Sequence, residues 1–226
     1  MLQSEYSALE AFMHSCMSDS AHDTEHVYRV LYSALDIAAY EQDVDIDILI
    51  AACLLHDIGR SAQLNDPSLC HAEVGSEMAY SYLTENGYSA AFAEDVRQCI
   101  LTHRFRKSRP PQSIEARILF DADKLDAAGA VGIARTLVYK GTVGEPLYSV
   151  LPDGSVSDGA GDETPSFFQE YKRKLEKLYS GFYTEIGAQL AAERKQAAEQ
   201  FYLSLYNEVS TLRDSGKSRL DKNLRK

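Results

Sequence analysis

Apolar residues recur three and four positions apart along most of the first 140 residues, which is the period of an α-helix. One such run follows Asp23, a residue type suited to an N-cap, and its apolar positions are Val27, Val30, Leu31, Ala34, Leu35 and Ala38. The next run, ILIAACLL at residues 48–55, is apolar on nearly all sides, and either Asp45 or Asp47 can cap it. A helix of this kind belongs in the core of a domain. Gly59 is suited to end it.

Three further helices are predicted before the composition changes. One runs from about Ala72 to the Asn86-Gly87 pair, which is typical of a helix C-terminus. The next carries a single stripe of Phe92, Val96, Cys99, Ile100 and His103. After the helix breaker SRPPQS, a fifth helix starts near Ser113 and reads IEARILFDADKLDAAGAVGIARTL as one element.

Residues 141–165 are rich in Gly, Asp, Ser and Pro and show no periodicity, so they predict a long loop that can act as a lid. Helical period returns at Phe167 and continues to about Leu212, and the basic tail from Lys217 is expected to fray. There is no internal repeat, and no second composition regime is large enough to form a separate domain. The pattern therefore predicts one all-α domain.

Composition narrows the class of protein further. The 226 residues are 45% hydrophobic and 25% charged, which is typical of a soluble globular chain, and the formal net charge is −11. Such a charge gives no general attraction to nucleic acid or to an anionic membrane. The chain has neither a long apolar window nor a secretory signal, so we expect a cytoplasmic protein. Cys16, Cys53, Cys70 and Cys99 lack C-x-x-C spacing and are expected to be reduced.

Ionisable residues interrupt the apolar helices at His26, His56, Asp57, His71, His103, Asp121, Asp123 and Asp126. Burying an imidazole or a carboxylate is costly unless it has partners. A divalent cation is one such partner, because manganese, iron, cobalt, nickel and zinc accept imidazole nitrogen and carboxylate oxygen in one shell. Neighbouring residues on a helix point about 100° apart, so His56 and Asp57 can share an ion only close to the end of the helix.

These positions carry a family resemblance. His26 in AHDTEHVYRV, the His56-Asp57 pair in LLHDIGR and Asp123 in DADKLDA resemble the H…HD…D signature of the HD-domain metal-dependent phosphohydrolase superfamily. The segment AEVGSEMA after His71, together with His103 and AGAVGIAR, resembles a bacterial branch in which some members cleave nucleoside triphosphates to monophosphate and pyrophosphate.

The resemblance implies an all-α helical bundle of the HD-domain type as a single domain over residues 1–226. Its metal-site core would span about 22–135, with a loop or lid at 141–165 and C-terminal helices at 166–212 packed on the core. Its metal ligands would be His26, His56, Asp57 and Asp123. On helical spacing alone Asp121 and Asp123 face opposite apolar sides and stay alternatives, but the family's A-D-x-x-(D/N/H) setting favours Asp123. We expect Asp126 to be a structural partner of a basic residue or a backbone amide.

A bound divalent cation lowers the pKa of coordinated water toward about 7. We expect this cation to be manganese, with cobalt, nickel, iron, zinc or magnesium as alternatives. Arg60 and Lys124 adjoin the ligands in sequence and are predicted to bind substrate phosphate. His22, His71 and His103 are predicted catalytic residues that relay protons or orient water. His71 and His103 can instead complete a second metal site.

The expected function is cleavage of nucleoside or deoxynucleoside triphosphates to monophosphate and pyrophosphate by metal-activated water. Arg60 occupies the position at which the nucleoside monophosphatase branch has an acidic catalytic residue. The catalytic mechanism of that branch therefore does not apply unchanged to this chain. One alternative is a phosphomonoesterase acting on nucleoside monophosphates or a phosphorylated metabolite. Another is a non-catalytic nucleotide-sensing helical module. The expected partner is a small phosphorylated molecule, first of all a nucleotide, and homodimer formation stays open.

Overall fold

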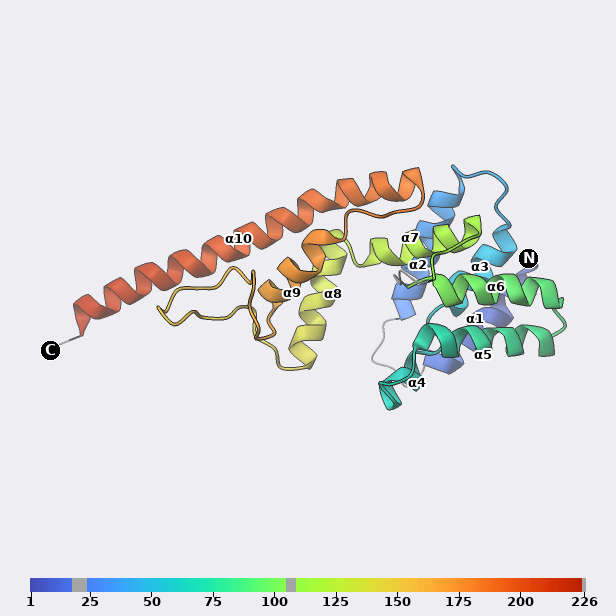
Figure 1. The fold of residues 1–226 in the computed structure, drawn as a ribbon, viewed down its shortest axis with the longest axis horizontal. Helices are drawn as coiled ribbons and strands as arrows, with labels where there is room; N and C mark the ends of the chain where they lie inside the picture. The colour runs from blue at the N-terminus through green and yellow to red at the C-terminus, as the bar shows by residue number, and fades with distance from the viewer. Residues whose placement is uncertain (18–23, 105–108, 225–226) are drawn as a thin grey trace. The chain divides into compact units, whose positions relative to one another are not determined.

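The computed structural model describes residues 1–17, 24–104 and 109–224. In these ranges the regular structure is helical apart from one isolated antiparallel bridge between Val150 and Val156, so the predicted all-α class is confirmed (Figure 1). The helices are α1 (Gln3–Met17), α2 (Thr24–Ala38), α3 (Ile46–Leu55), α4 (Arg60–Asn65), α5 (His71–Glu85), α6 (Ala90–Thr102), α7 (Ile114–Asp126), α8 (Gly129–Thr142), α9 (Phe167–Arg173), the 3-10 helix η1 (Leu175–Lys177) and α10 (Glu185–Asn223).

Contacts divide the chain into two compact units. The first comprises Met1–Asp126 and Phe182–Gly187, and the second Ala127–Gly181 and Ala188–Lys226. The prediction of a single domain stays a prediction. No helix in the described part of the chain has the length and apolar character needed to cross a membrane.

Helix α3 lies at the centre of the first unit, where it contacts α1, α2, α5, α6 and α7. Seven of its ten residues are buried, as its apolar pattern predicts. Of the two candidate caps, Asp45 fills the role, because its side chain accepts hydrogen bonds from the backbone N–H groups of Asp47 and Ile48. The core therefore forms around the helix that leads directly into the His56-Asp57 pair.

Helix α3 ends at Leu55, so the expectation that Gly59 ends it was wrong. Gly59 is instead the N-cap of α4, with an ordinary φ of −81°. A Cβ at this position would lie 2.3 Å from the carbonyl oxygen of His71 and 2.6 Å from the amide nitrogen of Gly75. The glycine is needed for close packing, because it lets the start of α4 touch the first turn of α5.

The single helix expected from about Ser113 is two helices, α7 and α8. The break falls at the two alanines that precede Gly129, whose φ is +67°. Alanine is the strongest helix former, so the two alanines did not indicate that a helix ends there, and the apolar pattern predicted one continuous helix. Glycine adopts positive φ without the steric cost that a side chain brings, and this residue turns the chain between the two helices.

The second unit has an aromatic core. Phe167, Phe168 and Tyr171 from α9 are buried with Ile133 of α8 and Tyr202 of α10, and the rings of Tyr171 and Tyr202 stack with centroids 4.1 Å apart. Between α8 and α9 the chain is a loop, close to the predicted range of 141–165.

The long helix α10 continues to Asn223, so the expectation of a frayed tail from Lys217 was wrong. No proline interrupts this segment. Within the second unit, Arg213 Nε donates a hydrogen bond of 2.5 Å to the carbonyl oxygen of Gly154. This contact ties the distal part of the helix to the loop that precedes α9.

Candidate metal centre

Five segments of the first unit bring their histidines and aspartates to one place. His26 lies in the first turn of α2, His56 and Asp57 directly follow α3, His71 is the first residue of α5, His103 caps the C-terminus of α6, and Asp123 lies in α7. His26, His56, Asp57, His71 and His103 are buried, while the Asp123 side chain is 25% exposed. The residues form two neighbouring groups.

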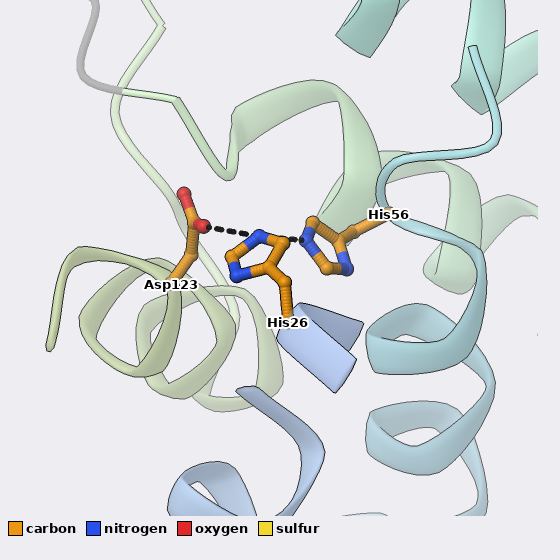
Figure 2. A group of neighbouring side chains, drawn as sticks. All are labelled: His26, His56 and Asp123. Carbon is orange, nitrogen blue, oxygen red and sulfur yellow. Dashed lines mark hydrogen bonds and ion pairs between the residues drawn. The ribbon is translucent and has the colours of Figure 1, made fainter. Parts of the chain in front are cut away.

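The first group contains the four predicted metal ligands. His26 Nε2 lies 3.3 Å from both His56 Nε2 and Asp123 Oδ1, and Figure 2 shows His26 between these two side chains. Asp57 Oδ2 lies 3.5 Å from His26 Nε2 and 3.7 Å from His56 Nε2. Donor atoms that each bind one ion at about 2.1 Å in a tetrahedral shell are about 3.4 Å apart. The observed spacing therefore suits a shared cation.

The second group lies on the other side of Asp57. Asp57 Oδ1 is 3.5 Å from His71 Nε2 and 3.8 Å from His103 Nε2. Both Nε2 atoms are buried and have no hydrogen-bond partner among the described residues. Asp57 thus turns one oxygen to each group of histidines.

Each histidine is oriented through its Nδ1 atom by a hydrogen-bond acceptor. The acceptors are Asp126 Oδ2 for His26 (2.7 Å), the Cys53 carbonyl for His56 (2.7 Å), Gln63 Oε1 for His71 (2.5 Å) and the Ile100 carbonyl for His103 (2.6 Å). Because these oxygens can only accept, Nδ1 carries the proton and donates it. In the neutral imidazole, which is the form that binds a metal, the lone pair on Nε2 is then directed into the cluster.

The surrounding charges keep the carboxylates ionised. Burial alone would raise the pKa of Asp57, but His56, His26 and Arg60 act together to hold it well below its usual range. Burial opposes ionisation of Asp123 too, and the hydrogen bond from His26 lowers its pKa. Burial likewise disfavours a charge on His26, but Asp123, Asp126 and Asp57 outweigh it and raise the pKa of His26 to about 10.

The two histidines of the second group behave in the opposite way. Burial, followed by the charge of Arg60, lowers the pKa of His71 to about 3. Burial, followed by the charge of His56, lowers the pKa of His103 to about 4. Both imidazoles are therefore neutral near pH 7, and neutral imidazole is the form that binds a metal.

Comparisons with known proteins show which family the chain belongs to. The model of the HD domain matches residues 24–128. The uncharacterized protein YpgQ of Bacillus subtilis (strain 168) is 31% identical over 210 residues, which cover 89% of this chain and 92% of YpgQ. The chain belongs to the HD-domain family.

Solved structures of HD-domain and related proteins show the same fold. The crystal structure of Bacillus subtilis YpgQ in complex with ADP has a TM-score of 0.70 at 28% identity and covers 90% of this chain and 97% of that one. An HD-superfamily hydrolase from Bacillus thuringiensis has a TM-score of 0.68 at 28% identity and covers 91% and 97%. The predicted enzyme class, an HD-family phosphohydrolase, is confirmed, and the HD domain with its His/Asp cluster implies a divalent metal.

The remaining predicted site residues are Arg60, Lys124 and His22. Arg60 Nε donates to Asp57 Oδ1 at 2.9 Å, and its side chain is 29% exposed. The Lys124 ammonium lies 4.5 Å from the ring centroid of Phe182 and 5.6 Å from that of Phe120, and burial lowers its pKa. Its role in phosphate binding stays a prediction. His22 lies outside the described residues.

Asp121 is engaged elsewhere in the first unit. It is fully buried and accepts hydrogen bonds from the backbone N–H groups of Tyr183 and Thr184 and from the Thr184 hydroxyl. Asp123 is the aspartate of this pair that lies in the HD-domain cluster, as the A-D-x-x-(D/N/H) setting favours. Asp126 pairs with a basic residue, Arg29, as expected, and it also contacts His26.

Two supporting residues were not found from the sequence. Arg29 lies one turn after His26, and this spacing was a usable signal, because residues three apart share a helix face. Gln63 gave no signal, since it lies in α4 and orients His71 in the next helix. Its contact with His71 depends on the close approach of α4 and α5 at Gly59.

Proposed function

We propose that this chain hydrolyses nucleoside or deoxynucleoside triphosphates to the monophosphate and pyrophosphate. In this proposal His26, His56, Asp57 and Asp123 hold a divalent cation, with manganese as the first choice. The main support is the spacing of 3.3–3.7 Å among their nitrogen and oxygen atoms. The ADP complex of the relative YpgQ supports a nucleotide as the class of substrate.

The residues present fit a divalent cation on their own chemistry. Two imidazole nitrogens and two carboxylates make a mixed donor set that suits manganese, iron, cobalt, nickel or zinc. When bound, such a cation supplies the positive charge that acidifies water and stabilises phosphoryl oxygens. Asp57 and Asp123 contribute the negative charge that a dication needs, and the hydrogen bonds at Nδ1 hold the two imidazoles in the ligating tautomer.

We extend the proposal to a second cation held by His71, His103 and the Oδ1 atom of Asp57. Two neutral imidazoles have buried Nε2 atoms without a hydrogen-bond partner among the described residues. A buried acceptor without a donor is costly, and a cation would remove that cost. Asp57 would then contact both cations, one with each oxygen.

Arg60 is the proposed phosphate-binding residue for which the structure gives the best support. Its Nε bond to Asp57 fixes the guanidinium beside the cluster, and its other N–H groups have no partner in the described part of the chain. An arginine fork can bind two phosphate oxygens at once. With a net charge of −11, the protein needs such local positive charge to attract a polyphosphate. Lys124 is the second proposed phosphate contact.

Product analysis tests the proposal directly. Pyrophosphate and orthophosphate release should be measured from nucleoside and deoxynucleoside tri- and monophosphates with added manganese, cobalt or magnesium. We expect pyrophosphate from triphosphates, and a loss of at least about 100-fold in Asp57→Asn, because outer-sphere substitutions alone cost roughly 10- to 100-fold. Asp95→Asn, the same change at an exposed position on α6, is the matched control and should keep full activity.

Other product patterns would replace the proposal. Orthophosphate released from monophosphates alone would establish a phosphomonoesterase. A protein that binds both a cation and a nucleotide but releases neither product would be a nucleotide-sensing module. Equal activity in Asp57→Asn and the wild type would contradict the proposed metal ligands.

A further inference from the structure

Among the described residues, Asp126 joins His26 and Arg29 in a hydrogen-bonded network at the edge of the cluster. Its Oδ2 atom accepts a 2.7 Å hydrogen bond from His26 Nδ1, and Arg29 donates to both carboxylate oxygens, from Nε to Oδ1 at 2.7 Å and from Nη2 to Oδ2 at 3.2 Å. Asp126 is only 4% exposed. Arg29 and His26 both come from α2, whereas Asp126 is at the end of α7, so the network fastens these two helices together beside the cluster.

His26 differs from the other three histidines in how it is oriented. His56 and His103 donate to backbone carbonyls three residues earlier in their own segments, so local chain geometry holds them. His71 donates to a neutral amide oxygen. The acceptor for His26 is a charged side chain that comes from 100 residues away in the sequence. The orientation of His26 therefore depends on Asp126 rather than on its own helix.

We infer that Asp126 is a positioning residue for the metal ligand His26, and that Arg29 holds Asp126 in place. This inference rests on the proposed metal site. The Arg29 fork fixes the plane of the carboxylate, so that Oδ2 stays in line with His26 Nδ1. When His26 is neutral, as a metal ligand must be, its remaining proton stays on Nδ1, and the lone pair of Nε2 is directed toward His56 and Asp123. Asp126 acts through His26 and does not itself contact the cation.

The substitution Asp126→Asn keeps the size of the side chain but changes its hydrogen bond to His26. It therefore tests whether Asp126 orients His26 or only fills space. Arg29 offers only donors, and its shorter bond goes from Nε to the Oδ1 position at 2.7 Å, so we expect the asparagine oxygen there and the NH2 group at the Oδ2 position, facing His26 Nδ1. Nδ1 would have to accept this bond, which transfers the imidazole proton to Nε2. That proton would point at the cation position. A side chain of almost unchanged shape would therefore block ligation by His26.

Cation binding, measured without substrate, tests the inference. We would titrate wild type and Asp126→Asn with Mn²⁺ and record the visible absorption spectrum with Co²⁺, which reports the ligand set. We expect the variant to bind Mn²⁺ roughly 10- to 100-fold more weakly, the range typical for outer-sphere partners of ligating histidines, and to show an altered Co²⁺ spectrum. Urea unfolding without metal would measure any general loss of stability.

Glu115→Gln is the matched control. Glu115 is a buried acid on the same helix, 7% exposed, whose Oε1 accepts a hydrogen bond from the backbone N–H of Asp45. Its loss of charge should leave Mn²⁺ affinity and the Co²⁺ spectrum unchanged. Equal weakening in both variants would show a general effect of removing a buried charge from α7 and would overturn the inference.

The remaining outcomes separate the inference from the proposed function. If the wild type binds Mn²⁺ and Asp126→Asn binds it equally with the same Co²⁺ spectrum, the positioning role is wrong and the metal site stands. If the wild type binds neither cation, the proposed function itself fails. Should Asp126→Asn not fold, Arg29→Lys provides the test, because lysine keeps the charge but loses the fork. Unchanged Mn²⁺ affinity in Arg29→Lys would then overturn the inference.

Discussion

Asp121 and Asp123 lie two residues apart on α7 and have different surroundings. Asp121 accepts hydrogen bonds from the segment that precedes α10, whereas Asp123 lies 3.3 Å from His26 Nε2. Helical spacing could not choose between them as metal ligands, because both face apolar sides of the helix. The difference arises from tertiary contacts, since Tyr183 and Thr184 are about sixty residues further along the chain.

Replacing each aspartate by alanine should therefore give opposite results. Asp121→Ala leaves the buried donors of Tyr183 and Thr184 without an acceptor, so we expect a loss of about 2–4 kcal/mol in the free energy of unfolding. Its Mn²⁺ affinity should be retained. Asp123→Ala should lose Mn²⁺ affinity instead. Urea unfolding and Mn²⁺ titration of the two proteins check this, and a folded Asp121→Ala protein that fails to bind Mn²⁺ would reverse the assignment.

The sequence predicted the side chains of the cluster better than the residues that hold them. His26, His56, Asp57 and Asp123 were expected together because a shared signature and the cost of burying charge pointed to the same positions. Their supports depend on contacts across the fold. The hydrogen bond between His26 and Asp126 spans 100 residues, and no local pattern encodes such a pairing.

At the scale of elements, the approach of α4 to α5 sets the position of His71. A Cβ on Gly59 would meet the His71 carbonyl oxygen and the Gly75 nitrogen at less than 3 Å, and both are backbone atoms that cannot rotate away. We expect Gly59→Ala to lower the free energy of unfolding by about 1–3 kcal/mol through overpacking. It should also displace His71 and weaken the second proposed cation site, which the stoichiometry of Mn²⁺ binding would report.

Gly141→Ala is the control for Gly59→Ala. Gly141 is a helical glycine in α8, and apart from its chain neighbours and the adjoining backbone of its own helix no described atom lies within 4 Å of the position of an added Cβ. Alanine there should be neutral or raise stability by up to about 1 kcal/mol, because it restricts the unfolded chain. If both alanine variants were equally stable and bound equal amounts of Mn²⁺, close packing at Gly59 would not set the position of His71.

The apolar stripes predicted where the helices lie, but they did not predict where the helices end. The stripes at residues 27–38 and 92–103 match α2 and α6, because burial of one face decides those helices. The break before Gly129 was missed, since alanine favours a helix and an apolar pattern does not reveal the positive φ of Gly129. The extension of α10 to Asn223 was missed because a basic, polar tail gives no apolar period.

At the scale of the whole molecule, the two groups of ligands lie in one compact unit. Residues 26, 56, 57, 71, 103 and 123 all belong to the first unit, and the second unit, as far as it is described, contains no comparable group of histidines and acids. The two units are joined at residues 126–127 and again at 181–182 and 187–188. Cation binding should therefore stabilise the first unit directly, and its effect on the second unit measures how strongly the stabilities of the two units are coupled.

Hydrogen exchange with and without Mn²⁺ measures this coupling. A ligand that binds only the folded state stabilises it by about 2.7 kcal/mol at a free concentration of 100 Kd, which slows exchange through global opening about 100-fold. We expect such slowing at the core amides of α3 and α7, and its reversal when a chelator removes the metal. Exchange in α9 decides the domain prediction, since equal slowing there would indicate one cooperative domain and unchanged exchange would indicate two. Unchanged exchange in α3 and α7 at saturating Mn²⁺ would mean that the cluster does not bind the cation.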